Sequence, residues 1–206
     1  MTLFKNKYRV ESTRLQHWDY SSDGAYFVTI CTKDRKELFG EIRNGIMGLN
    51  EMGNAAAICW QNISSHFPFV ELDDWVVMPN HVHGVIIINK QNNAQTTTVT
   101  VPSVPSVETQ NFASLRGERG GRNNGFDNLN ANKFGPQSKN LASIMRGFKI
   151  GVTKYAKSNN IDFKWQARYY DHIIRDENEL NRICEYIQNN PWKWEQDRNN
   201  PENIWM

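Results

Sequence analysis

The stretch "MPNHVHGVIII", residues 78–88, places two histidines directly before a hydrophobic run. Hydrophobic, β-branched residues at this density predict a buried β-strand. Side chains two positions apart point to the same side of an extended chain, so His81 and His83 share one face of this strand. Two neighbouring imidazoles on a core strand are either structural or two ligands of one metal ion. On its own, such a pair is more often structural.

The segments around this strand predict a sheet covered by helices. Strand, strand, helix and strand pair follow one another in the first half of the chain, an order typical of an α+β or α/β domain. A long helix, a short strand and a last helix follow in the second half. The predicted strands are 25–33, a short one within 34–45, two segments of 69–88 around Pro79, and 171–175; the predicted helices are 50–67, 139–160 and 176–190.

The composition fits one domain that is interrupted by an insertion. A chain of 206 residues, 39% of them hydrophobic, suits one ordinary domain with or without a large insertion. After Lys90 the sequence becomes rich in Thr, Ser, Asn, Gly and Pro and loses any apolar period. We therefore predict a single domain over residues 1–206 with a flexible insertion at 91–138.

Cysteine usage and hydropathy exclude some classes of protein. Cys31, Cys59 and Cys184 are a scattered set without a Cys-x-x-Cys pair, which argues against a disulfide framework and a structural zinc knuckle. We find neither an N-terminal apolar segment before a cleavage site nor a run of about 18 apolar residues. We expect a soluble cytoplasmic protein without a membrane partner.

The basic charge is concentrated in one region. Residues 139–175 hold eight lysines or arginines and two aspartates, a local charge of +6 where the whole chain has +2. Trp165, Tyr169 and Tyr170 stand among these cations, and aromatic rings interleaved with cations can hold unpaired bases and phosphates. A solvated helix face explains part of the charge. The candidate DNA-binding residues are Arg146, Lys149, Lys157, Lys164, Arg168 and Arg175.

The last predicted helix carries a tyrosine outside its apolar stripe. Asp176 is suited to the N-cap, and Pro191 ends the helix. The apolar residues between them fall on one stripe, which leaves the hydroxyl of Tyr186 free to point at a site. Asn190 comes four residues later and so faces the same way.

Three segments together resemble a known family. "VVMPNHVHGVI", "LASIMRGFK" and "WQARYYDHIIRDENELNRICEYIQNNP" are similar to segments of the REP-associated tyrosine transposases. These enzymes belong to the single-tyrosine, IS200-like branch of the HUH nucleases, named for their His-hydrophobic-His motif. The order of the segments matches from about residue 8 to 195, and 91–138 lies outside the shared pattern.

The resemblance implies a fold and a nucleophile. The fold would be α+β, a ferredoxin-like (RRM-like) antiparallel sheet with helices packed on it, the histidine pair on a central strand and the tyrosine on a C-terminal helix. Tyr186 would attack a DNA phosphate, form a 5′-phosphotyrosine link and release a 3′-hydroxyl. The nearest competitor for this role is the pair Tyr169 and Tyr170.

The resemblance also implies a metal and a substrate. Mg²⁺ or Mn²⁺ would be held by His81, His83 and a polar residue of the tyrosine helix, with Asn190 ranked first and Gln188 second. Imidazole pairs usually favour zinc or other transition metals, so the metal follows from the family alone. The substrate would be single-stranded DNA, cut at or near palindromic hairpins in a prokaryotic nucleoid. Some relatives form homodimers that exchange the tyrosine helix and others act alone, so both states stay open.

Two other classes of protein remain open on the sequence. A non-catalytic module that binds single-stranded DNA or RNA would share the basic region and the aromatic residues, but it would not need Tyr186 near the histidines. A zinc hydrolase would need further ligands, and the chain has only five histidines.

Overall fold

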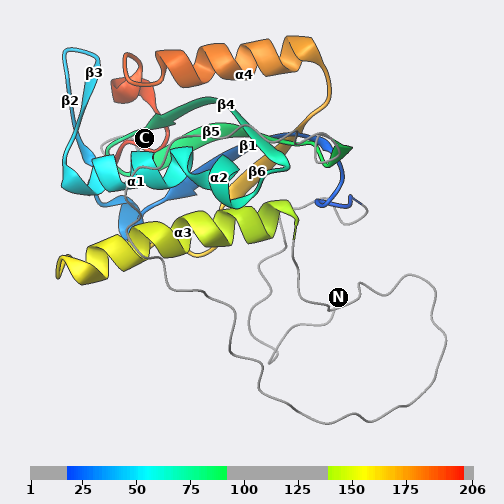
Figure 1. The fold of residues 1–206 in the computed structure, drawn as a ribbon. Coiled ribbons are helices and arrows are strands. Elements are labelled where there is room, and N and C mark those ends of the chain that lie inside the picture. The colour runs from blue at the N-terminus through cyan, green and yellow to red at the C-terminus, as the bar shows by residue number, and fades with distance from the viewer. Residues whose placement is uncertain (1–17, 92–138, 202–206) are drawn as a thin grey trace, which may run out of the picture. The chain divides into compact units, whose positions relative to one another are not determined.

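A four-stranded antiparallel sheet forms the centre of the computed structural model, which describes residues 18–91 and 139–201 (Figure 1). Apart from Gln91, the predicted insertion lies outside the described residues. The strands of the sheet, in spatial order, are β4 (Val70–Val77), β5 (His81–Ile88), β1 (Gly24–Cys31) and β6 (Tyr170–Ile174). The helices are α1 (Glu51–Gln61), α2 (Ile63–His66), α3 (Leu141–Ser158) and α4 (Glu177–Asn189), and two short 3-10 helices span Lys33–Arg35 and Trp194–Gln196.

The connectivity is that of a ferredoxin-like fold. The elements β1, α1, β4, β5, α3 and β6 follow the β-α-β-β-α-β order of that fold, and each neighbouring pair of strands in the sheet is antiparallel. The expected α+β class is confirmed, and β5, which carries the histidine pair, is a central strand.

The region between β1 and α1 differs from the prediction of one short strand. It forms a two-stranded hairpin of β2 (Gly40–Arg43) and β3 (Ile46–Leu49). The turn is Asn44 and Gly45, with φ of 52° and 74°, and an Asn-Gly pair with two positive φ angles is the favoured two-residue hairpin turn. The signal for the second strand was therefore present in the sequence.

The helix predicted for 50–67 is divided into α1 and α2. Asn50 caps α1 as expected, since its Oδ1 accepts a hydrogen bond from the backbone N–H of Gly53 at 3.0 Å. The division falls at Asn62, whose ψ of −4° departs from the helical value near −42°.

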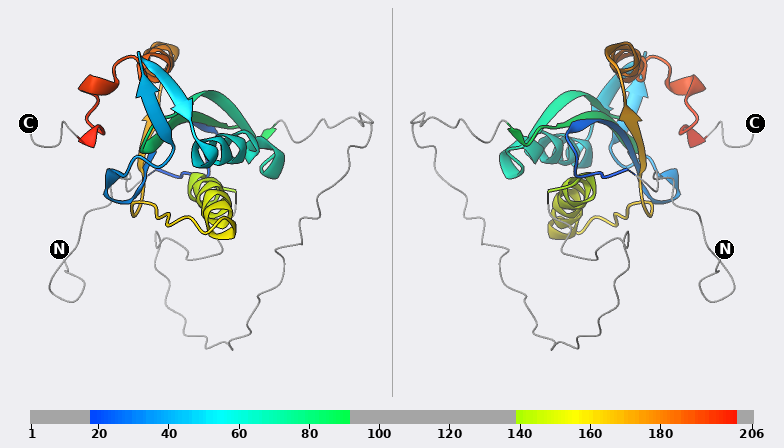
Figure 2. Two further views of the ribbon diagram at one scale, coloured as in Figure 1. Left: turned by 90° about the vertical axis from the view of Figure 1, so that its left-hand side faces the viewer. Right: turned by 90° about the vertical axis from the view of Figure 1, so that its right-hand side faces the viewer.

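The sheet buries side chains on both of its faces. One face packs against α1 and α3, where the ring of Trp60 fills the space above Gly84 so closely that a Cβ on this glycine would lie 2.2 Å from it. The other face packs against α4 through a smaller cluster of Phe27, Val85 and Ile187. Figure 2 shows α4 on one side of the sheet and α3 on the other.

Strand register decides which polar residues face α4. Residues directly opposite each other in an antiparallel pair point to the same side. Thr29 of β1 lies opposite His83 of β5 and opposite Tyr170 of β6, and Cys31 lies opposite His81. Phe27 belongs to the cluster under α4, and Thr29 and Cys31 follow it at intervals of two residues along β1, so they face α4 as well. The residues opposite them on β5 and β6 therefore face α4 too.

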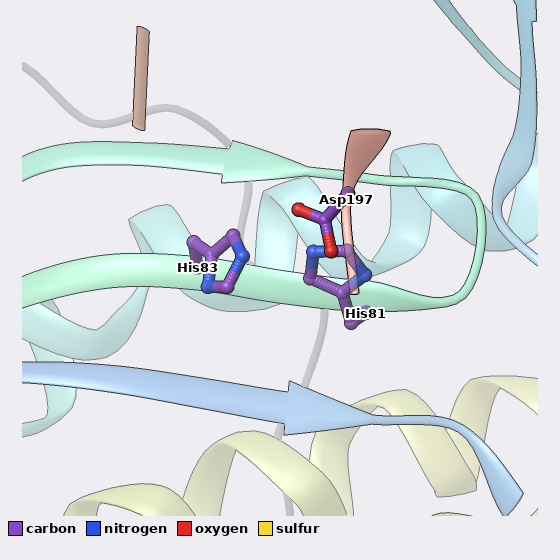
Figure 3. A group of neighbouring side chains, drawn as sticks. All are labelled: His81, His83 and Asp197. Atoms are coloured by element: carbon purple, nitrogen blue, oxygen red, sulfur yellow. The ribbon is translucent and has the colours of Figure 1, made fainter. Parts of the chain in front are cut away.

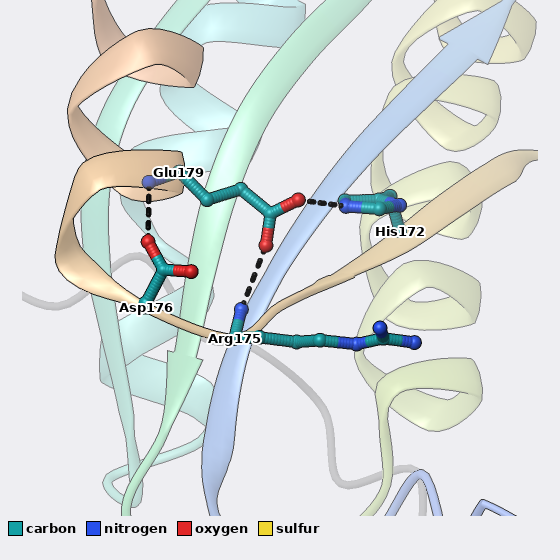
Figure 4. Close-up of polar contacts among 4 residues, drawn as sticks. All are labelled: His172, Arg175, Asp176 and Glu179. Atoms are coloured by element: carbon teal, nitrogen blue, oxygen red, sulfur yellow. Dashed lines mark hydrogen bonds and ion pairs between the residues drawn. The ribbon is translucent and has the colours of Figure 1, made fainter.

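The junction of β6 and α4 is tied by a small polar cluster (Figure 4). Asp176 caps α4, since its Oδ1 accepts a hydrogen bond from the backbone N–H of Glu179 at 2.8 Å. The carboxylate of Glu179 in turn accepts from the backbone N–H of Arg175 at 2.9 Å and is hydrogen-bonded to Nε2 of His172 at 2.8 Å. These contacts set where α4 starts on the sheet. Among the described helices, none combines the length and the apolar character needed to cross a membrane.

Candidate active site

The two histidines are buried side by side at the start of β5. Both side chains have an exposed fraction of 0%, and their ring centroids are 4.3 Å apart. Nδ1 of His81 is hydrogen-bonded to Oδ1 of Asn80 at 2.7 Å, and Nδ1 of His83 to Oγ1 of Thr29 at 2.8 Å. Both rings are thus held by Nδ1, so that Nε2 of each ring faces the site.

Burial keeps both imidazoles neutral. Together with the positive charges of Arg35 and Arg198, it lowers the pKa of His81 to about 3. Burial also lowers the pKa of His83 well below its usual value, with a further contribution from His81 beside it. Neutral imidazole is the form that binds metal ions.

Helix α4 brings Tyr186 to the histidine pair. Its hydroxyl lies 3.2 Å from Nε2 of His83 and donates a hydrogen bond to Oδ2 of Asp197 at 3.3 Å. Its ring meets Phe27 edge to face with centroids 6.1 Å apart, and 41% of the side chain is exposed. Partial burial and the negative charge of Asp197 raise the pKa of this phenol to about 12, so it needs help to lose its proton.

The third member of the site, Asp197, was not predicted. It follows the 3-10 helix after α4, and its exposed fraction is 7%. One carboxylate oxygen accepts from the side-chain N–H of Asn190 at 2.8 Å, and the other from the backbone N–H of Asn199 at 2.6 Å. Figure 3 shows Asp197 gathered with His81 and His83, and ligand atoms of the three residues lie within 4.8 Å of one another. No periodicity in the polar sequence after Pro191 marks this aspartate.

The two amides proposed as metal ligands have different surroundings. Asn190 is 2% exposed and contacts Asp197, so it belongs to the site. Gln188 donates to Oδ2 of Asp74 on β4 at 2.9 Å and lies on an exposed part of α4. Of the two amides, Asn190 is the one that contacts Asp197, the carboxylate beside the histidines.

The donor set suits a divalent cation. Nε2 of His81 and Oδ1 of Asn190 are both buried, and within the described ranges neither has a hydrogen-bond partner. Buried polar atoms without a partner cost free energy, and a metal ion is one way to satisfy them. Two imidazole nitrogens with a carboxylate oxygen form a ligand set found for several divalent metals. The cluster can therefore hold a metal ion.

The predicted DNA-binding residues lie on several parts of the fold. Helix α3 lies across the sheet from α4 and carries the exposed Arg146 and Lys157 (Figure 1). Lys149 is instead used inside the protein, since its Nζ donates to the backbone oxygens of Gln166 and Arg168 at 2.9 and 3.1 Å. The remaining predicted residues, Lys164, Arg168 and Arg175, are exposed on the segments before and after β6.

Other cations lie close to the histidines. Arg35 and Arg198 both act on the pKa of His81, and Arg35 Nη1 donates to the backbone oxygen of Arg198 at 2.5 Å. Lys193 and Arg198 line a pocket beside Tyr186. These residues stand far from the histidines in the sequence, and no local pattern marked them.

No family model matches the chain, but similar proteins and solved structures were found. An uncharacterised protein of Haemophilus influenzae is 42% identical over 188 residues, which cover 91% of each chain. A putative REP-associated tyrosine transposase of the same organism is 22% identical over 85% of this chain and 74% of its own. The solved structure of a REP-associated tyrosine transposase bound to a REP hairpin has the same fold, with a TM-score of 0.52, 16% identity and coverage of 90% of this chain and 74% of that one. With its fold and its histidine pair on a central strand, the chain is similar to the REP-associated tyrosine transposases, in agreement with the resemblance of its sequence to IS200-like HUH enzymes.

Proposed function

We propose that the protein is a metal-dependent endonuclease and strand transferase for single-stranded DNA that forms a 5′-phosphotyrosine intermediate on Tyr186. The observation that carries the proposal is the 3.2 Å separation of the Tyr186 hydroxyl from Nε2 of His83. A tyrosine beside a buried histidine pair and a carboxylate has the parts of an activated nucleophile. Tyr170 is the first residue of β6 and Tyr169 precedes it, so neither tyrosine is on α4.

Each side chain of the site has a role in this reaction. The oxygen of Tyr186 attacks the phosphorus of a DNA phosphodiester, and the 3′ oxygen of the preceding nucleotide leaves and takes up a proton. Asp197 accepts the phenol's hydrogen bond and is positioned to take the proton. The 3′-hydroxyl can later attack the phosphotyrosine and rejoin the strand, without a nucleotide cofactor, because the link preserves a phosphodiester.

His81, His83 and Asp197, with Asn190 beside them, would hold the metal ion. When bound, a divalent ion such as Mg²⁺ or Mn²⁺ supplies Lewis-acid stabilisation of charge on the scissile phosphate. The same nitrogen and carboxylate donors also suit zinc, so the identity of the metal is part of the test.

The substrate we propose is single-stranded DNA at or near a palindromic hairpin. The related transposase of known structure was solved with a REP hairpin. In this protein, Arg35, Lys193 and Arg198 place positive charge near the histidine pair, where a phosphate backbone would approach.

The experiment that tests the function is a denaturing gel after incubation with single-stranded hairpin DNA from the flanks of the protein's own gene. Reactions contain Mn²⁺, Mg²⁺, Zn²⁺ or a chelator, and a Tyr186→Phe variant serves as the matched control. A covalent protein–DNA band that needs the metal and Tyr186 supports the proposal. DNA binding without any band would instead indicate a non-catalytic binding module.

A further inference from the structure

A pocket opens beside the hydroxyl of Tyr186 on the α4 face of the sheet. Its volume is about 520 Å³, within the range of ~300–1,000 Å³ of small-ligand sites. The lining residues used below are Phe27, Tyr170, Tyr186, Lys193, Asp197 and Arg198. Of the lining residues, the proposed chemistry uses Tyr186, Asp197 and Asn190, and it gives no role to the aromatic wall of the pocket.

Aromatic rings form one wall of this pocket. Phe27 meets Tyr170 and Tyr186 edge to face, with ring centroids 6.3 and 6.1 Å away. Phe27 is 8% exposed, whereas 42% of Tyr170 is exposed. An exposed aromatic ring next to a pocket is a surface on which a planar ring can stack, and nucleic-acid bases use such surfaces irrespective of sequence.

Cations stand at the same pocket. The guanidinium carbon of Arg198 lies 5.6 Å from the ring centroid of Tyr170, in a cation–π contact. The exposed Lys193 follows α4 and lines the pocket as well. A ligand that suits this combination carries a planar aromatic ring and a negative charge close to each other. A nucleotide has both, in its base and its phosphate.

We propose that the pocket holds the unpaired nucleotide that flanks the scissile phosphate, with its base on Tyr170 and its phosphate beside Lys193 and Arg198. The inference rests on the proposed function, since the phosphate next to this nucleotide is the one that Tyr186 attacks. Tyr170 is then a positioning residue, which holds the strand so that the phosphate reaches the hydroxyl of Tyr186.

The test separates binding from cleavage. The probe is a single-stranded oligothymidine of about eight nucleotides with one 2-aminopurine, whose fluorescence falls when it stacks on a ring. Binding is measured in a Tyr186→Phe protein, which cannot form the covalent link. In this protein, Tyr170→Ala should weaken affinity about tenfold and remove the quenching that stacking causes, and Tyr170→Phe, which keeps the ring, should restore both. Ile58→Ala, a change of an exposed apolar residue on α1, is the remote control.

The outcomes for the two proposals differ. Unchanged affinity and quenching in the Tyr170→Ala variant would overturn the pocket proposal, even if wild-type protein forms a covalent adduct. Absence of an adduct with wild-type protein would overturn the proposed function, while the quenching would still decide whether the pocket binds a nucleotide. With Tyr186 restored, Tyr170→Ala should raise the DNA concentration needed for half-maximal adduct formation more than it lowers the maximal rate.

Discussion

The hydroxyl of Tyr186 lies 3.2 Å from Nε2 of His83, although the two residues are 103 positions apart in the chain. Two local arrangements produce this meeting. The register of β1 against β5 turns His83 toward α4, and the contacts of Glu179 with β6 and its end set the start of the helix. Tyr186 then stands over the histidine on the same side of the sheet.

Replacing Tyr186 by Phe should abolish cleavage and leave the fold intact. The substitution keeps the ring and its contact with Phe27, so the free energy of unfolding should change by less than ~1 kcal/mol, as expected when one hydroxyl group and its hydrogen bond are removed. Thermal melts and a covalent-adduct gel measure the two effects. Tyr169→Phe and Tyr170→Phe are the controls and should still form the adduct.

Mass spectrometry of the trapped adduct locates the nucleophile directly. The nucleotide should lie on the peptide that contains "ICEYIQNNP", residues 183–191. An adduct on "ARYYDH", residues 167–172, would move the nucleophile to another tyrosine without changing the class of enzyme.

Removal of a metal-ligand side chain should separate metal binding from DNA binding. His83→Ala and Asp197→Asn should each weaken Mn²⁺ binding at least ~10-fold in calorimetry. Mutation of a residue that only contacts a metal ligand already has an effect of this size, so the loss of a ligand itself should have at least the same effect. Hairpin affinity should stay within a few-fold, because other residues contact the phosphates. Glu177→Gln, a change in an exposed carboxylate in the first turn of α4, is the matched control. Loss of the fold in His83→Ala would instead indicate a structural histidine.

The exposed cations of α3 should contribute to DNA affinity through phosphates alone. Arg146→Gln combined with Lys157→Gln should lower the slope of log affinity against log salt by roughly 0.7 for each phosphate that the variant no longer neutralises, with no change in sequence preference. Lys149→Gln should act differently and lower the melting temperature, because its amino group holds the backbone at Gln166 and Arg168. An unchanged slope in the double variant would mean that this helix does not touch the DNA backbone.

Glu179→Gln should lower stability at neutral pH and not in acid. Hydrogen bonds from the backbone of Arg175 and from His172 hold the pKa of Glu179 below its usual value of 4.5. A carboxyl with a depressed pKa contributes stability that is present above the pKa of the unfolded chain and is lost as pH falls through the folded-state value. The difference in melting temperature between wild type and variant should therefore shrink below about pH 4.5. Glu177→Gln, on the same turn of α4, is the control.

The parts of the fold that depend on local sequence could be predicted. The strand that carries His81 and His83 on one face, and the N-cap at Asn50, depend on interactions within a few residues. Both appear as predicted. The Asn44–Gly45 turn was equally local and was overlooked.

Asp197 and Lys149 could not be assigned from the sequence. Asp197 reaches the histidines because a polar segment folds back after α4, and Lys149 is used internally because the segment before β6 crosses α3. Both are effects of tertiary structure that leave no periodic trace.

Only Arg175 and Asp176 separate β6 from α4, and the contacts of Glu179 tie the helix to its own strand. A connection this short keeps Tyr186 over the histidines of the same chain. Mixing a His83→Ala chain with a Tyr186→Phe chain should therefore not restore cleavage, whereas proteins that trade helices would rebuild a working site from the two defective copies. Under the proposed function, one polypeptide would then be a complete catalytic unit, and inactive copies would interfere with it only by competing for DNA.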